Sequence, residues 1–569
     1  MPVAIWIVGE EEEVDRERVQ SRADFDRALA RVRGGRAGHL ERIGGEIARA
    51  APGAPWRASA AAPLIEAELT PEEIRRVERL AAVGAIDHVG GAPVDDLDDS
   101  LALARWSNLG VANGTGVKVG ILESARPVTL DELAPVTIRD PMGASSYHAS
   151  VVTGIVKNHT GGSSPPGYAS DASIFIANRI VGEASSSLAD IDWATSQGTT
   201  AHAQSWHLPA GETSGALSAR DRYLDYNTRS GARFYAMAAG NIVAGQTESE
   251  FVNHKGYNVV VVGAAGDDGR IADGVATWPT DYPSCAGNPA CGLCSGTLHS
   301  TFRNDSAGQE LPHLTANGNC VVAAGNIDSG TSLAAPAVAG IAAGLQERNT
   351  ELAFWPEPLK AILLASPSTS TSPDGCAWRY RRGATGGCVS DGRDGTGLVD
   401  GTAALAMAEN RRLPVSGPRA SQGYDRRFVT RADFDPNTRL LRDANGPLYW
   451  EVVGEQPTGN GCFYFGRRLR AVLAWDSKVS CTSPSSCTDT LAMDLDLLVY
   501  EEPGHALFAQ SATVSNSYEH VDVGIRDNLI SCSPPGVGWY YRIYVRLNNY
   551  ASLPSTESTY LGLAWQTYP

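Results

Sequence analysis

Three patterns of hydrophobic and polar residues follow one another along the chain. Residues 1–92 alternate short apolar runs with two helical segments, as small α+β domains do. Between residues 100 and 412, short runs rich in Val, Ile and Ala alternate with segments of helical periodicity. Beyond residue 420 the helical periodicity disappears, and aromatic residues, Thr, Val and turn formers dominate. The patterns therefore predict three domains, at residues 1–92, 100–412 and 420–569.

The first domain is predicted to contain three strands and two helices. Thr70 is a candidate N-cap, Pro71 takes the first helical position, and two glutamates follow in the first turn. We expect this helix to run to about Val83, and an acidic linker at residues 95–99 to mark the domain boundary and a cleavage region. The other expected elements are a helix at 23–50 and strands at 3–8, 63–69 and 86–89.

The middle domain is predicted to contain a parallel sheet with helices on both faces. Its apolar runs are short, and helical segments separate them, which is typical of consecutive β-α-β units. In such sheets catalytic groups gather at the carboxyl ends of the strands. The expected strands are 117–122, 173–177, 201–207, 233–239 and 259–264, and the expected helices are 148–157, 187–197 and 215–230.

The last domain is predicted to be an antiparallel β-sandwich. A period of two places Asp494 and Asp496 on one face of a strand, opposite Leu495. Adjacent carboxylates repel each other, so either a structural calcium ion binds between them or they lie on a solvated face near the strand end. The expected strands are 470–475, 494–500, 539–545 and 560–565.

One run of small residues, 329–340, carries the strongest chemical signal. It leads from a flexible turn to Ser332, at the start of a segment in which apolar residues recur at helical spacing. A serine at a helix N-terminus is usually a simple cap. The same position also suits a nucleophile, because free N–H groups and the helix dipole favour negative charge there.

The partners that a nucleophilic serine needs lie upstream of it. Acyl transfer requires a base, a group that orients the base, and donors for the oxyanion. Glu123 ends a predicted strand, His148 opens a predicted helix, and Asn241 ends another strand in the run Ala-Ala-Gly-Asn. Together with Gly-Thr-Ser-x-Ala-Ala-Pro around Ser332, these motifs and their order resemble those of the subtilisin-like serine proteases (subtilases).

The resemblance, strong over residues 100–405, implies roles for the motif residues. Ser332 would attack the scissile carbonyl, and His148 would serve as general base and then as general acid. Asn241 would donate a hydrogen bond to the oxyanion, beside the backbone N–H of Ser332. The segments implied to bind substrate contain Ser205, Trp206, His207, Ala239 and Gly240.

Two positions depart from the family pattern. Glu123 stands where the family has aspartate, and although it is one methylene longer, a glutamate can also orient an imidazole. Asp131 and Asp140 are weaker alternatives for the orienting acid. At the second departure the family has Ser-Leu-Gly, a segment that pairs with the substrate backbone as an added strand, whereas this chain has Ser-Trp-His at residues 205–207.

The flanking domains resemble family parts more weakly. The first domain is similar to the inhibitory propeptide of subtilases, although a simple accessory domain is the alternative. The last domain resembles the jelly-roll domain that follows the catalytic domain in some bacterial members. The resemblance therefore implies an intramolecular inhibitor at the N-terminus and an all-β domain after the catalytic one.

Composition narrows the classes of partner. The 569 residues carry a net charge of −17, which argues against nucleic acid and anionic membrane as partners. No apolar run reaches the roughly 18 residues of a membrane span. The first residues, apolar but followed at once by glutamates, do not form a convincing signal peptide.

Ten cysteines, all in the second half of the chain, indicate disulfides and an oxidising compartment. Cys376 with Cys388, and Cys481 with Cys487, can close local loops. A four-thiolate zinc site is the alternative for the remaining cluster, which consists of Cys285, Cys291, Cys294 and Cys320.

We therefore expect a secreted or periplasmic serine endopeptidase that cleaves protein or peptide substrates through an acyl-enzyme. The expected protein is a monomer, and its chemistry requires no cofactor. Two alternatives remain open: a catalytically inactive binding protein of the same fold, and a ligase or cyclase that passes the acyl group to an amine.

Overall fold

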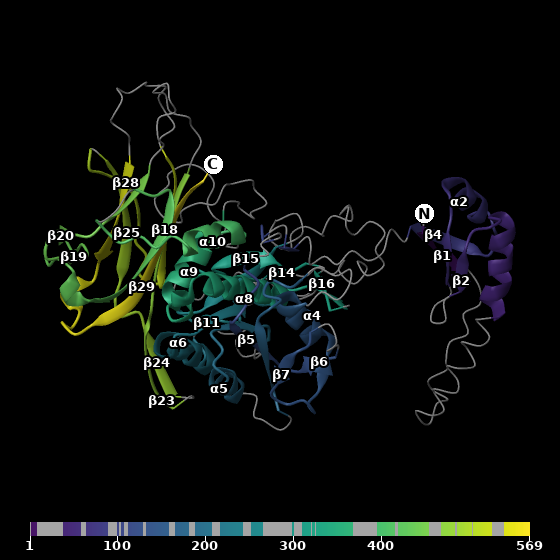
Figure 1. Ribbon diagram of the computed structural model, residues 1–569, viewed down its shortest axis with the longest axis horizontal. Helices are drawn as coiled ribbons and strands as arrows, with labels where there is room; N and C mark the ends of the chain where they lie inside the picture. The colour runs from purple at the N-terminus through teal and green to yellow at the C-terminus, as the bar shows by residue number, and fades with distance from the viewer. Residues whose placement is uncertain are drawn as a thin grey trace, which may run out of the picture. The chain divides into compact units, whose positions relative to one another are not determined.

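The structure is a computed structural model of the chain. It divides into two compact units: among the described residues the first comprises 2–88 and the second 100–568, and the second contains both the parallel sheet and the β-sandwich (Figure 1). The residues described are 2–7, 38–58, 64–88, 100–101, 104–106, 112–128, 133–158, 166–180, 188–206, 217–242, 252–265, 299–300, 310–319, 321–324, 326–367, 395–415, 419–453, 468–483, 486–502, 504–525 and 540–568.

The N-terminal unit is an antiparallel sheet with two helical segments. Residues 38–50 are helical and place Leu40, Ile43 and Ile47 in one apolar stripe, which packs with Ile65 of the sheet. The rest of the expected helix, 23–37, lies outside the described residues. The strand order is β2 (Trp56–Ala58), β3 (Leu64–Glu68), β1 (Pro2–Ile7) and β4 (Val83–His88).

The predicted helix start in this unit is confirmed, but the predicted helix end is wrong. The Thr70 hydroxyl accepts the Glu73 N–H, and the Glu73 carboxylate accepts the Thr70 N–H, which completes a capping box. Helix α2 (Pro71–Val77) ends at Val77, because the chain then turns through Leu80 and enters strand β4 at Val83.

The predicted parallel sheet is present and has seven strands. Each neighbouring pair is parallel, which matches the β-α-β reading of the sequence. Strand β10 ends at Gln204, three residues before the expected end. The order is β15 (Leu314–Asn317), β13 (Val260–Ala265), β11 (Phe234–Ala238), β10 (Ala201–Gln204), β5 (Lys118–Glu123), β9 (Ser173–Asn178) and β7 (Val136–Ile138).

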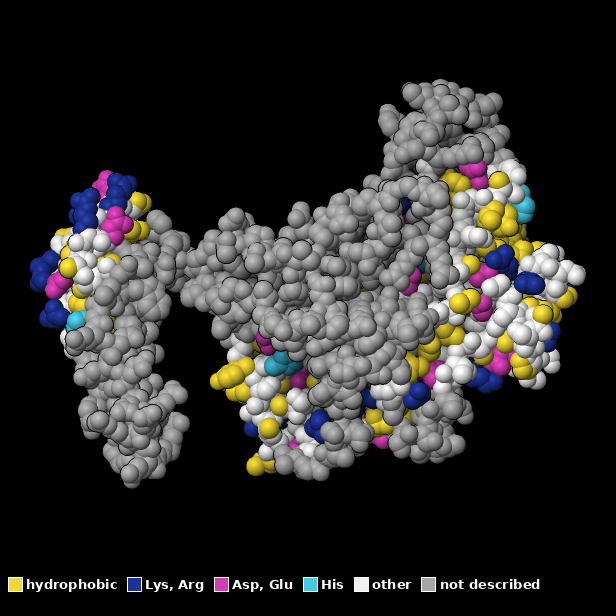
Figure 2. All heavy atoms as spheres, turned by 180° about the vertical axis from the view of Figure 1, so that it is seen from behind, with side chains coloured by type: hydrophobic (Ala, Val, Ile, Leu, Met, Phe, Trp, Pro, Cys, Tyr) yellow, Lys and Arg dark blue, Asp and Glu magenta, His cyan; other side chains and the backbone are white. Residues whose placement is uncertain are grey.

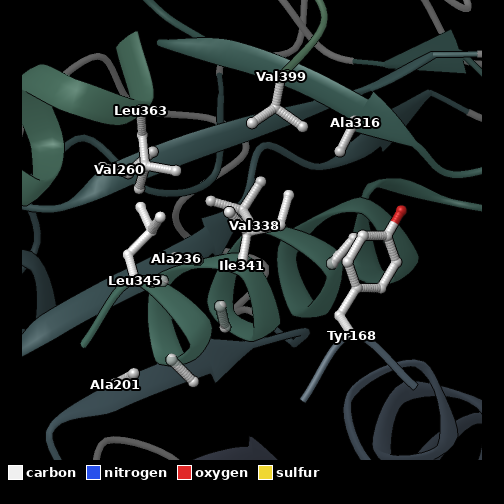
Figure 3. Packing of buried hydrophobic residues seen from close by; sticks show 14 of the residues in the cluster. Tyr168, Ala201, Ala236, Val260, Ala316, Val338, Ile341, Leu345, Leu363 and Val399 are labelled. Carbon is white, nitrogen blue, oxygen red and sulfur yellow. The ribbon is translucent and has the colours of Figure 1, made fainter. Parts of the chain in front are cut away.

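Both faces of this sheet are buried, which explains why its strands are apolar almost without interruption. Successive residues of a strand enter different cores: Ile121 packs on one face and Leu122 on the other. On the first face Val338 and Ile341 of helix α8 (Thr331–Arg348) pack with Ala236 and Val260 of the sheet (Figure 3). Helices α4 (Tyr147–Lys157) and α8 (Thr331–Arg348) contact each other there, and α5 (Ala189–Ser196) and α6 (Ala219–Gly231) also pack on the sheet.

The predicted sandwich is also present, as two four-stranded antiparallel sheets. Alternate residues such as Leu469, Leu497 and Ile543 form the core between the sheets. One sheet has the order β18 (Gln422–Thr430), β29 (Ser558–Tyr568), β22 (Arg468–Trp475) and β27 (Tyr518–Gly524). The other has the order β21 (Trp450–Val453), β28 (Tyr540–Leu547), β25 (Leu495–Glu502) and β26 (Ala506–Ser511).

The sandwich packs directly on the domain with the parallel sheet. The outward residues of β22 and β29, including Val472 and Ala564, join the first core of that domain. They meet α9 (Pro356–Ala365), and α10 (Gly401–Ala408) contacts β18. A Cβ on Gly562 would lie 2.2 Å from the backbone nitrogen of Pro358, so only glycine permits this approach.

Short elements complete the described part of the chain. The two-stranded pairs are β6 (Arg126–Pro127) with β8 (Ser145–Ser146), β12 (Asn241–Ile242) with β14 (His299–Ser300), β16 (Val321–Ala323) with β17 (Asn326–Asp328), β19 (Arg442–Asp443) with β20 (Gly446–Pro447), and β23 (Lys478–Ser483) with β24 (Ser486–Thr490). Three 3₁₀ turns are η3 (Thr350–Ala353), η4 (Arg431–Asp433) and η5 (Tyr550–Ser552).

The described surface mixes charges of both signs. Acidic and basic side chains are interspersed over the visible face of the second unit (Figure 2). Among the described residues, no helix is both long enough and apolar enough to cross a membrane.

Candidate active site

The candidate residues meet at the carboxyl edge of the parallel sheet. Glu123 is the last residue of β5, Ser205 follows β10, and Asn241 lies just beyond β11. Since β5, β10 and β11 are neighbours in the sheet, their ends come together. This is the edge at which open α/β sheets place their ligands.

The candidate nucleophile and base face each other across two packed helices. Ser332 lies in the first turn of α8, and His148 in the first turn of α4. The Ser146 hydroxyl caps α4 by accepting the Ala149 N–H at 2.9 Å, which fixes the start of the helix. As a result, the His148 Nε2 atom lies 2.8 Å from the Ser332 Oγ atom.

Glu123 lies on the other side of the imidazole. Its Oε1 atom is 3.3 Å from His148 Nδ1, and the side chain is 1% exposed. The Ser124 N–H donates to Oε2 at 3.2 Å, which orients the carboxylate. The Oε1 contact is long for a charge-assisted hydrogen bond, and it is an ion pair when the imidazole is protonated.

The environment favours the charged form of His148. Burial of the imidazole opposes its protonation. The nearby Glu123 carboxylate and then the charge of Asp328 outweigh burial and raise the pKa of His148 to about 9. The site therefore stabilises the imidazolium that forms when the serine gives up its proton.

Asn241 is held so that its amide N–H₂ group faces the nucleophile. Its Oδ1 atom accepts the Thr331 N–H at 2.9 Å and the Thr331 hydroxyl at 3.0 Å, so Nδ2 must point away from Thr331. Gly330 has φ +154°, and a Cβ on it would lie 3.0 Å from Asn241 Nδ2 and 3.1 Å from Ser332 Oγ. The glycine therefore keeps the space between nucleophile and amide open.

The other expected substrate-binding residues border the same place. The Ser205 hydroxyl donates to the Ser332 carbonyl at 2.7 Å. Ala239 follows β11 in an extended segment, and the Gly240 N–H donates to the Thr331 hydroxyl at 2.9 Å. Trp206 comes directly after Ser205, and His207 lies outside the described residues.

Of the two alternative acids, Asp140 is described and has its contacts away from His148. Asp140 accepts the Met142 N–H within its own loop, and its backbone N–H pairs with Asn178. Asp131 lies outside the described residues. Glu123 is therefore the carboxylate that the fold brings to the imidazole.

The contacts of Asp494 and Asp496 give little support to the predicted calcium site. Asp496 is fully buried and pairs with Arg546 at 2.6 Å, and Asp494 accepts a hydrogen bond from Asn548 at 3.0 Å. No group of three or more His, Cys, Asp or Glu side chains suited to a metal occurs among the described residues. Calcium at Asp494 and Asp496 stays a prediction, with Arg546 already supplying a positive charge.

The predicted disulfides and zinc site mostly lie outside the described residues. Cys481 and Cys487 are backbone partners in the β23–β24 hairpin, as a local pairing requires, but their side chains are not described. The bond between them stays a prediction. The other eight cysteines, including the candidate zinc ligands, lie outside the described residues.

Two contributors to the site were not recognised in the sequence. Thr331 fixes the amide of Asn241, and Asp328 adds negative charge near His148. Thr331 lies within the serine motif, so its place in the sequence could have indicated a role in the site. No sequence pattern indicates such a role for Asp328, because the hairpin of β16 and β17 brings it near the histidine.

Comparison with known families agrees with this geometry. A family model described as the subtilase family, peptidase S8, matches residues 131–388, which include His148, Asn241 and Ser332. This part of the chain is therefore similar to the subtilase family. The match begins after Glu123, so the departure at that position falls outside the matched range.

Several solved structures are similar to the chain at low identity. A protease of Pseudoalteromonas arctica PAMC 21717 is 18% identical and covers 55% of this chain and 98% of its own, with a TM-score of 0.36. A serine protease of Aeromonas sobria is 13% identical over 81% of this chain and 90% of its own, with a TM-score of 0.36. The prenylagaramide maturation protease PagA is 19% identical over 55% and 98%, also with a TM-score of 0.36. No curated protein sequence matches the chain significantly.

Proposed function

We propose that the chain is a serine endopeptidase that hydrolyses protein or peptide substrates through an acyl-enzyme. The observation that carries the proposal is the 2.8 Å contact between His148 Nε2 and Ser332 Oγ, with the Glu123 carboxylate behind the ring. A capping serine needs no such partner, since capping uses only its own helix. The similarity of residues 131–388 to the subtilase family supports the same reading.

The first chemical step follows from the positions of the three side chains. Glu123 can only accept hydrogen bonds when ionised, so His148 carries its proton on Nδ1 and offers the lone pair of Nε2 to the serine. Ser332 Oγ attacks the scissile carbonyl carbon while His148 takes the hydroxyl proton. The proton then passes to the leaving amine, and the acyl group stays on Ser332.

The oxyanion forms next to two donors. The Asn241 Nδ2–H group and the Ser332 N–H, in the first turn of α8, can both point toward the carbonyl oxygen. The free N–H groups and the dipole of the helix add favourable charge there. Water, activated by His148, then hydrolyses the ester, and the enzyme returns to its starting state.

The N-terminal unit belongs to the same proposal, as a propeptide that inhibits the enzyme until it is removed. Secretion or export to the periplasm is proposed with it, since the loop cysteines favour an oxidising compartment. A monomer that requires no cofactor for its chemistry suffices for the reaction, because the three residues come from one chain.

A fluorophosphonate probe tests the proposal directly. The active enzyme, freed of residues 1–92, should become labelled, and the Ser332→Ala variant should not. Absence of labelling in the wild type would overturn the enzyme proposal and leave a binding protein. Mass analysis of the products then separates hydrolysis, which adds water, from ligation, which joins two peptides.

A further inference from the structure

A second pair of a histidine and a carboxylate, which the reaction does not use, lies near the segment after β10. His254 Nδ1 is 3.6 Å from Asp221 Oδ1, and the two residues are 3% and 1% exposed. Asp221 Oδ2 also accepts the Ser218 N–H and hydroxyl, at 2.9 and 2.7 Å, in the cap of α6. The carboxylate is thus anchored to a helix start, and it presents its other oxygen to the imidazole.

The far side of His254 reaches the segment after β10. Its Nε2 atom lies 3.2 Å from the Trp206 carbonyl oxygen and 3.3 Å from Gln204 Nε2. Gln204 Nε2 itself donates to the Trp206 carbonyl at 2.9 Å. The imidazole therefore lies between the Trp206 carbonyl and the Asp221 carboxylate, and the Gln204 side chain contacts the same carbonyl from strand β10.

The side chain of Trp206 is fixed by the same group of residues. Its ring lies 4.6 Å from the guanidinium of Arg220 and 5.3 Å from that of Arg179. Arg220 is held in turn by two bonds to Asp190, at 3.1 and 2.6 Å, and it donates to the Gln204 Oε1 atom. The charges of Arg220 and Asp190 are buried and paired, so these two side chains are rigid supports rather than free ligand groups.

The other end of the segment is tied to the nucleophile. The Ser205 hydroxyl donates to the Ser332 carbonyl, so the Ser205–Trp206 edge has fixed points on both sides. We infer that His254 is a positioning residue: through the Trp206 carbonyl it holds this edge in the register that an extended substrate needs. The inference rests on the proposed function, because it concerns how that enzyme binds its peptide.

The inference predicts a selective effect on long substrates. An extended peptide that adds to a protein edge strand uses backbone hydrogen bonds over several residues. A single-residue ester reaches only the nucleophile and the oxyanion donors, which His254 does not contact. Loss of His254 should therefore raise KM for a long peptide and leave kcat, and all kinetics of the short ester, nearly unchanged.

The test compares His254→Ala with wild type on a peptide of eight or more residues and on an N-acyl amino acid nitrophenyl ester. We expect KM for the peptide to rise about 5- to 20-fold, the range of one buried hydrogen bond, with less than twofold change for the ester. His254→Gln, which can still donate to the Trp206 carbonyl, should recover most of the loss.

His202→Ala is the matched control. His202 is also fully buried in β10, but it contacts Phe234 and Thr199 and does not touch the substrate edge. It should destabilise the fold without separating the two substrates. If His254→Ala changes peptide and ester equally, or if His254→Gln gives no recovery in a folded protein, the positioning role is wrong.

The same experiment separates this inference from the proposed function. Fluorophosphonate labelling of the wild type tests the nucleophile, and labelling of His254→Ala at the wild-type rate shows that its nucleophile is intact. Unlabelled wild type would overturn both proposals. Labelled wild type and variant with unchanged peptide KM would overturn the positioning role alone.

Discussion

Glu123→Gln is the most informative single substitution, because it keeps the size of the side chain and removes its charge. The carboxylate lies 3.3 Å from His148 Nδ1 and is almost completely buried. With an amide in its place, the imidazolium loses its counter-charge. The amide can also present its N–H₂ group to Nδ1, which would favour the tautomer that cannot accept the Ser332 proton.

The magnitude follows from the pKa of His148. Its rise from 6.5 to about 9 corresponds to about 3 kcal/mol of preference for the imidazolium, at 1.36 kcal/mol per pH unit. The His148 side chain is 32% exposed, so solvent screening reduces the figure to about 2 kcal/mol, or roughly 30-fold in rate. The wrong tautomer adds to this, as when Asp-to-Asn lowers kcat by ~10⁴ in another serine protease. We expect a total loss between ~10² and ~10⁴.

The assay is kcat for a fluorogenic peptide, measured with active enzyme freed of residues 1–92. Circular dichroism and thermal unfolding should show that the Glu123→Gln protein is folded. Glu123→Asp is the matched control: it keeps the charge and shortens the arm, so it should lose less activity than Glu123→Gln. Activity of Glu123→Gln within fivefold of wild type would refute the reasoning and show that another group holds His148.

Three further predictions concern pH, packing and processing. In the free enzyme, His148 accepts a proton from Ser332 only when neutral, so kcat/KM should rise with pH and reach half its plateau near pH 9; a midpoint at or below 6.5 would contradict the ion pair with Glu123. The raised pKa also stabilises the fold fully below about pH 6.5, and this contribution should fade up to pH 9 in thermal unfolding. Gly562→Ala should cost about 1–3 kcal/mol of unfolding free energy, since its Cβ meets the Pro358 backbone; denaturant unfolding with a shift below 0.5 kcal/mol would disprove that close contact. Finally, purified wild type should lose an N-terminal fragment near residues 92–99, whereas Ser332→Ala should stay intact by mass spectrometry; equal cleavage in both would point to another protease.

The sequence predicted which candidate residues lie together better than it predicted the bounds of the elements around them. Glu123, His148 and Ser332 each stand at a strand or helix end, and parallel topology brings such ends together without further information. Asp328 and the pair of His254 and Asp221 could not be predicted, because each is brought into place by a long-range contact that leaves no local periodicity.

The sandwich was predicted as a class, but half of its strands were missed. Strand β27 contains Glu519, His520 and Asp522, all buried, and it does not read as an apolar run. Its burial depends on partners from other strands, such as Arg470, which pairs with Asp522 at 2.7 Å. Strand β26 begins with the apolar run Ala506-Leu507-Phe508-Ala509, but these residues are exposed or only half-buried, so their pattern does not mark a core strand. In both cases the tertiary environment outweighs the local pattern.

The packing of β29 on α9 has a consequence for the timing of synthesis. Strand β29 lies centrally in the inner sandwich sheet and adds Ala564 to the core that also holds α8. At 5–20 residues per second a ribosome needs about 10–45 s to travel from Ser332 to this strand. During that interval the nascent chain already contains Ser332, but the core that packs against α8 still lacks the side chains of β29. Completion of this core, and with it of the candidate active site, therefore has to wait until β29 has been synthesised.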